Sequence, residues 1–123
     1  MTTSIPQALQ TALQQYFDVI YHCDLDKFDG LFAPSAQLQT MRGSEHVVIS
    51  RDDYRAMLAQ RVPPASVKAP RHDEVFQAEL NGEACALAKV GVSIIDKQFV
   101  DYLCLLKTGG RWQIVSKVYT QTA

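Results

Sequence analysis

Residues 72–120 contain runs in which apolar and polar side chains alternate, and tight-turn signals join these runs. Asn81-Gly82 is the strongest short hairpin signal, and Gly109-Gly110 marks a second tight turn. The runs predict strands over residues 72–80, 83–95, 98–108 and 111–120, paired as a long antiparallel meander. A meander of this length must bury one face, so this feature limits the possible folds more than any other.

The first part of the chain has helical spacing instead. Apolar residues recur at intervals of three and four from Ile5 to Ile20, which predicts an amphipathic helix that ends near Tyr21, with Ser4 as its cap. Asp24 predicts the cap of a short second helix whose buried stripe is Phe28, Leu31 and Phe32.

Two short strands are predicted next, over residues 36–41 and 47–49. Ser50 predicts the cap of a third helix, which Pro63-Pro64 ends. This order predicts a single α+β domain over residues 1–123. Its three N-terminal helices would pack on one face of a strongly curved, mixed and mostly antiparallel sheet.

Charge and composition exclude several classes of protein. Twelve Lys and Arg against thirteen Asp and Glu give a net charge of −1, so we expect no nucleic-acid partner. No apolar run approaches the roughly 20 residues of a membrane helix, so we expect no membrane partner. The N-terminus has no features of a secretory signal, and the three cysteines form no C-x-x-C pair. We therefore expect a cytoplasmic protein with reduced thiols.

The Gly109-Gly110 turn also predicts which side chains share a face of the sheet. If Thr108 pairs with Arg111, one face carries Phe99, Asp101, Leu103, Leu105, Trp112, Ile114, Ser116 and Val118. The opposite face then carries Val100, Tyr102, Cys104, Leu106, Val115, Lys117 and Tyr119. Both faces are too apolar to meet water, so we expect one to pack on the helices and the other to form a homodimer.

Asp101 is the most informative candidate for chemistry because it is a lone carboxylate on an apolar strand face. Such a group is costly unless it is paired or used. In a pocket it would suit general acid or base catalysis; the alternative is a structural pair with Lys, Arg or the backbone. His72, at the start of a strand, is a candidate proton shuttle or a plain surface histidine.

Further side chains are candidates for ligand contact. Tyr16 could polarise a carbonyl or be a core residue, and Arg61 could clamp an anionic group or bond the last carbonyls of its helix. The candidate wall of a binding pocket, which could equally be plain core, is Phe28, Phe32, Met41, Met57 and Trp112. Nucleotide-binding and zinc-protease motifs are absent, and no cluster has metal-ligand spacing. We therefore expect a pocket without cofactor or metal.

Two longer motifs carry a resemblance to a known family. They are Leu31-Phe32-Ala33-Pro34-Ser35-Ala36 and Gly109-Gly110-Arg111-Trp112-Gln113-Ile114-Val115. Over nearly its whole length the chain resembles the nuclear-transport-factor-two-like superfamily, also called cystatin-like or SnoaL-like, and within it the Putative lumazine-binding group. The resemblance implies a conical pocket, a dimerising sheet face and a pocket tyrosine at Tyr16. A His72–Asp101 pair would resemble the dyads of dehydratases in that superfamily.

Members of this superfamily include enzymes, ligand-binding proteins and adaptors, so the fold leaves the function open. One hypothesis is a cofactor-independent isomerase, dehydratase or cyclase that uses Asp101, His72 and Tyr16 on a small apolar or aromatic substrate. A second is a protein that binds a small aromatic molecule unchanged. A third is a dimeric adaptor in which Phe28, Met41 and Met57 fill the cone.

Overall fold

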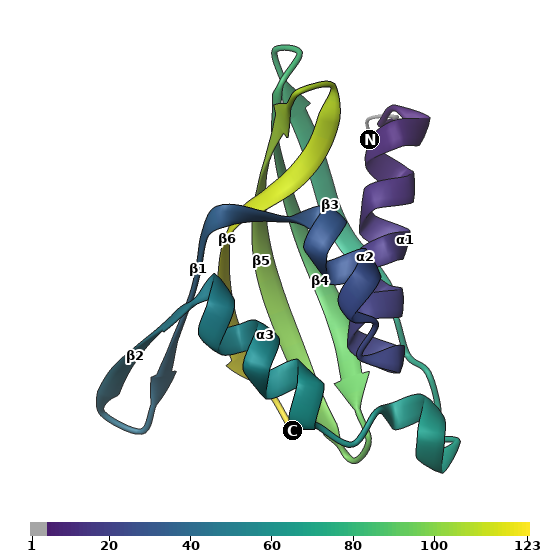
Figure 1. The fold of residues 1–123 in the computed structure, drawn as a ribbon, viewed down its shortest axis with the longest axis vertical. Coiled ribbons are helices and arrows are strands. Elements are labelled where there is room, and N and C mark those ends of the chain that lie inside the picture. Colours follow the sequence, from purple (N-terminus) through teal and green to yellow (C-terminus); the bar gives the residue numbers. More distant parts are fainter. Residues whose placement is uncertain (1–4) are drawn as a thin grey trace.

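The computed structural model describes residues 5–123, which form three α-helices, a short 3-10 helix and six strands (Figure 1). The helices are α1 (Gln7–His22), α2 (Leu25–Leu31), α3 (Arg51–Gln60) and the 3-10 helix η1 (Pro64–Val67). The strands are β1 (Phe32–Arg42), β2 (Glu45–Ser50), β3 (Glu74–Asn81), β4 (Cys85–Ile94), β5 (Lys97–Thr108) and β6 (Arg111–Gln121). The expected order of elements is confirmed, and η1 is an addition.

The six strands form one mixed sheet in the order β2-β1-β6-β5-β4-β3. β3 to β6 make the expected antiparallel meander, while β1 runs parallel to β6 and antiparallel to β2. The sheet is curled but not closed (Figure 1). This confirms an α+β fold with three helices on a curved, mostly antiparallel sheet.

The helix boundaries follow local capping chemistry. The Asp24 side chain accepts a hydrogen bond from the backbone N–H of Lys27 at 3.1 Å, and Ser50 accepts one from Asp53 at the same distance. Both predicted caps are thus confirmed. α1 begins at Gln7 with Pro6 in the N-cap position, and Ser4, the expected cap, lies outside the described residues.

The helices bury their apolar faces against the inner face of the sheet. α1 contacts β4 and β6, α2 contacts β1 and β6, and α3 contacts β1 and β2. The α1 side chains in this core are Leu9, Ala12, Leu13, Tyr16, Phe17, Val19 and Ile20. None of the helices in residues 5–123 combines the length and apolar content needed to cross a bilayer.

The predicted turn register is confirmed, but the predicted faces of β6 are only partly correct. Thr108 pairs with Arg111 as expected, yet the pairing skips Val115: Leu105 faces Ile114, whereas Cys104 faces Ser116. This β-bulge inserts one residue into β6 and so reverses the side-chain alternation beyond it. Lys117 and Tyr119 therefore lie on the inner face with Asp101, and Ser116 and Val118 lie on the outer face.

Candidate functional site

A cavity of about 320 Å³ lies on the inner face of the sheet, under α3. Gln121, near the C-terminus of the chain, is one of the residues that line it. α3, β1, β4, β5 and β6 supply its walls, through Thr40, Met41, Arg42, Tyr54, Met57, Arg61, Val92, Ile94, Lys97, Phe99, Asp101, Lys117, Tyr119 and Gln121. Met41 and Met57 lie in this wall with 59% and 41% of their surface exposed, and they leave the cavity open.

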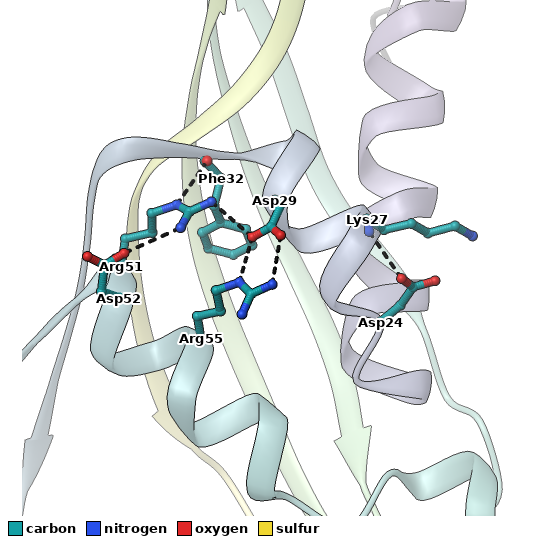
Figure 2. A network of polar contacts seen from close by, with 7 residues as sticks. All are labelled: Asp24, Lys27, Asp29, Phe32, Arg51, Asp52 and Arg55. Carbon is teal, nitrogen blue, oxygen red and sulfur yellow. Dashed lines mark hydrogen bonds and ion pairs between the residues drawn. The ribbon is translucent and has the colours of Figure 1, made fainter.

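An ion cluster fixes α3, which supplies the wall residues Tyr54 and Met57, to α2. Both carboxylate oxygens of Asp29 accept hydrogen bonds from Arg55, at 2.7 and 2.8 Å, and Arg51 adds a third at 3.2 Å (Figure 2). The Arg51 guanidinium also lies 5.0 Å from the ring centroid of Phe28, a buried residue of α2. These contacts fix α3 against α2, in the position where α3 also packs on β1 and β2.

Asp101 lies in the cavity wall and is only 1% exposed. The Tyr16 hydroxyl donates a hydrogen bond of 2.5 Å to its Oδ2, and the ammonium nitrogen of Lys117 lies 3.7 Å from the same oxygen. Among residues 5–123, both polar partners of the carboxylate meet Oδ2, and none of the hydrogen bonds found there involves Oδ1. The lone carboxylate seen in the sequence is therefore paired on one side only.

Lys117 is 5% exposed and is surrounded by aromatic rings. Its nitrogen lies 5.0–5.2 Å from the ring centroids of Tyr16, Tyr54 and Tyr119, and it donates a hydrogen bond of 3.3 Å to the Tyr54 hydroxyl. Burial by itself lowers the pKa of Lys117, but the Asp101 carboxylate and the Tyr54 hydroxyl outweigh it and raise the pKa above its ordinary value. Lys117 is thus a protonated cation at neutral pH.

Tyr16 is fully buried and lies behind Asp101, outside the set of residues that line the cavity. Burial and the neighbouring negative charge of Asp101 raise the pKa of Tyr16 well above its ordinary value. Its hydroxyl therefore stays protonated and is engaged by Asp101. This geometry suits a residue that holds the carboxylate in position.

Arg61 follows the last residue of α3 and lies in the cavity wall. Its backbone N–H bonds the carbonyls of Met57 and Leu58, but its side chain makes none of the hydrogen bonds found among residues 5–123. Nη1 is buried without a partner, and the guanidinium carbon lies 5.8 Å from the ring centroid of Tyr54. The expected bonding of the helix carbonyls by this side chain is therefore not found.

The remaining predicted site residues divide between the cavity and other places. His72 is exposed in the irregular segment before β3, and none of the Asp101 contacts involves it. Phe28 and Phe32 stack on each other in the core, with ring centroids 4.5 Å apart. Trp112 borders a separate groove beside α1 and α2. Of the predicted contact residues, Met41, Met57 and Arg61 line the cavity.

One residue of the site, Lys117, was missed as a binding or catalytic candidate from the sequence. Lys117 was assigned to the wrong face because no sequence signal marked the bulge at Val115. Among residues 5–123, no three His, Cys, Asp or Glu side chains gather closely enough to hold a metal ion.

Three helices on a curled, mixed six-stranded sheet form the fold of solved structures described as NTF2-like or cystatin-like. The model of the family described as Putative lumazine-binding matches residues 5–120, so the chain belongs to that family. No curated protein matches this chain.

Solved structures confirm the superfamily fold. An NTF-2 like protein of unknown function from Silicibacter pomeroyi DSS-3 aligns with a TM-score of 0.83 at 23% identity, covering 94% of this chain and 93% of that one. An NTF2-like protein of unknown function from Methylobacillus flagellatus KT gives 0.81 at 19% identity, covering 100% and 99%. A putative ketosteroid isomerase from Kribbella flavida DSM 17836 gives 0.59 at 16% identity, covering 95% and 79%. Likeness at these identities establishes the fold alone.

Proposed function

We propose that this protein binds a small molecule in the cavity under α3. The observation that carries the proposal is the pairing of an open cavity of about 320 Å³ with a buried polar floor made by Asp101 and Lys117. Ligand sites are commonly concave and largely apolar, with a few fixed polar groups that orient the ligand. Here Met57, Val92 and Phe99 supply apolar wall around that floor.

The adaptor alternative has less support. It requires Phe28, Met41 and Met57 to fill the cone, whereas Phe28 is in the core and both methionines border open space. The family description names lumazine, a pteridine, which makes lumazine a sensible first probe. Naphthamide and naphthoate are two further probes. Both have a naphthalene ring system, and naphthoate carries a negatively charged carboxylate where naphthamide carries a neutral amide.

A blocked cavity tests the binding proposal. Ile94 lines the cavity and its neighbour Ile95 is exposed outside it, so Ile94→Trp and Ile95→Trp are a matched pair. In calorimetric titrations we expect at least one of the three probes to bind the wild type and Ile95→Trp, and to lose binding in Ile94→Trp. No binding by any probe, or equal binding by both variants, would contradict the proposal.

A second candidate function is proton transfer by Asp101. The observation that favours it is the free Oδ1 of a buried carboxylate in the cavity wall. In this version Oδ1 removes a proton from carbon next to a ligand carbonyl, and Tyr16 acts as a positioning residue. The exposed His72 takes no part.

Hydrogen exchange tests this candidate directly. Acetonaphthone is an aromatic ketone whose methyl protons exchange slowly with deuterium in buffered D₂O, which NMR follows. We expect the wild type and the exposed control Asp96→Asn to accelerate the exchange, and Asp101→Asn to return it to the buffer rate. An exchange rate with Asp101→Asn equal to that with the wild type would contradict proton transfer by Asp101. The binding proposal would still stand.

A further inference from the structure

The side chains that line the cavity carry an excess of positive charge. Four of them are basic, Arg42, Arg61, Lys97 and Lys117, and one is acidic, Asp101. The whole chain has a net charge of −1, so this excess is local and not a reflection of composition. Within residues 5–123, Lys117 pairs with Asp101, and the ion pairs found there include none of the other three cations.

The side chain of Arg61 has a hydrogen-bond donor that no other group among residues 5–123 satisfies. Its Nη1 is buried and has no hydrogen-bond partner among residues 5–123. A buried donor without a partner is unfavourable, and more so when it is charged. The arginines on the other side of α3, Arg51 and Arg55, both bond the Asp29 carboxylate (Figure 2). Residues 5–123 therefore supply an acidic partner to those two arginines and none to Arg61.

Lys117 also has donor capacity left. Its ammonium has three N–H donors, of which one is given to the Tyr54 hydroxyl at 3.3 Å. The Asp101 oxygen at 3.7 Å is beyond a good hydrogen bond for a second. Lys117 and Arg61 thus both border the cavity, and a ligand oxygen could accept hydrogen bonds from their N–H groups.

We infer that the ligand of this cavity is a small carboxylate-bearing molecule with an apolar, ring-sized body, and that Arg61 is the residue that selects its charge. The inference rests on the proposed binding function. A carboxylate accepts two parallel hydrogen bonds from a guanidinium, and Ile94 and Phe99 lie in the wall to receive the body.

Naphthoate and its neutral isostere naphthamide test this inference because they differ only in the charged group. In calorimetric titrations at low salt we expect the wild type to bind naphthoate about tenfold or more tightly than naphthamide, the range of one charge-assisted hydrogen bond. Arg61→Gln should remove that preference, so that naphthoate and naphthamide bind this variant with about equal affinity. Arg111→Gln, an exposed arginine outside the cavity, should behave as the wild type.

A second variant keeps the test decisive if Arg61→Gln disturbs the end of α3. Arg61→Lys retains the positive charge but cannot form the bidentate hydrogen bonds of a guanidinium, so it should keep part of the preference for naphthoate. Equal wild-type affinity for both probes, or a preference that survives Arg61→Gln, would overturn the inference while leaving the binding proposal intact. Binding of neither probe, nor of lumazine, would overturn the binding proposal itself.

Discussion

The ammonium nitrogen of Lys117 lies 3.7 Å from Oδ2 of Asp101, with both side chains buried on one face of the paired strands β5 and β6. The bulge at Val115 makes this pairing possible, because a regular β6 would turn Lys117 to the outer face. One inserted residue thus converts an isolated carboxylate into the polar floor of a cavity.

Removing the cation from this pair should be costly. Lys117→Met leaves Asp101 buried without its counter-charge, and we expect a loss of about 3–5 kcal/mol in the free energy of unfolding, measured by urea at pH 7. The double variant Asp101→Asn with Lys117→Met should recover part of the loss, since it removes both charges. The exposed Lys107→Met is the control. A loss for Lys117→Met no larger than that of the control would show that the pair is not coupled.

The Tyr16 hydroxyl should stabilise the fold through its bond to Asp101. Tyr16→Phe deletes this donor, and the loss expected for a hydrogen bond to a charged group is about 1.5–3 kcal/mol. Tyr102→Phe deletes a hydroxyl on the exposed outer face and should change stability very little. Urea unfolding of both variants measures the difference, and equal losses would contradict the role given to the buried bond.

Alkaline pH should weaken the fold through the same cluster. Folding raises the pKa of Tyr16 above its ordinary 10.0 and that of Lys117 above 10.5, so the unfolded chain releases these protons first. In the interval between the unfolded and native pKa values the native state holds more protons, and the free energy of unfolding falls as pH rises. The contribution is fully present at neutral pH and is lost above about pH 10.

Tyr16→Phe isolates one part of this alkaline effect. Its free energy of unfolding, followed by urea titration across the alkaline range, should decline less steeply than that of the wild type, because one of the two groups no longer titrates. Tyr102→Phe should keep the wild-type slope. Parallel curves for the two variants would contradict the assignment to Tyr16.

Most of the fold could be predicted because its signals are local. Asp24 and Ser50 cap helices as expected, and Gly109-Gly110 fixes the last hairpin register. The site could be predicted only in part, because two of its side chains, Lys117 and Tyr119, come from the part of β6 that follows the bulge. Residues 112–119 are apolar on both faces, so no alternation in the sequence showed where one residue was inserted.

The outer face of the sheet supports a second proposal, that two copies of the chain pair through it. Its exposed apolar side chains include Leu87, Tyr102, Leu106 and Val118, and large exposed apolar patches are typical of interfaces. We expect a dimer by size-exclusion chromatography with light scattering at micromolar concentration. Leu106→Lys should yield a monomer, and Val62→Lys, exposed beyond α3, should not. A wild-type monomer would remove the proposal.

The most direct test of the account is a crystal structure of the protein grown with naphthoate. We predict the naphthalene ring in the cavity under α3, with the carboxylate of naphthoate within hydrogen-bond distance of the Arg61 guanidinium. Naphthoate bound only on the outer face of the sheet, or a cavity without it at a saturating concentration, would contradict the claim that this hollow is the binding site.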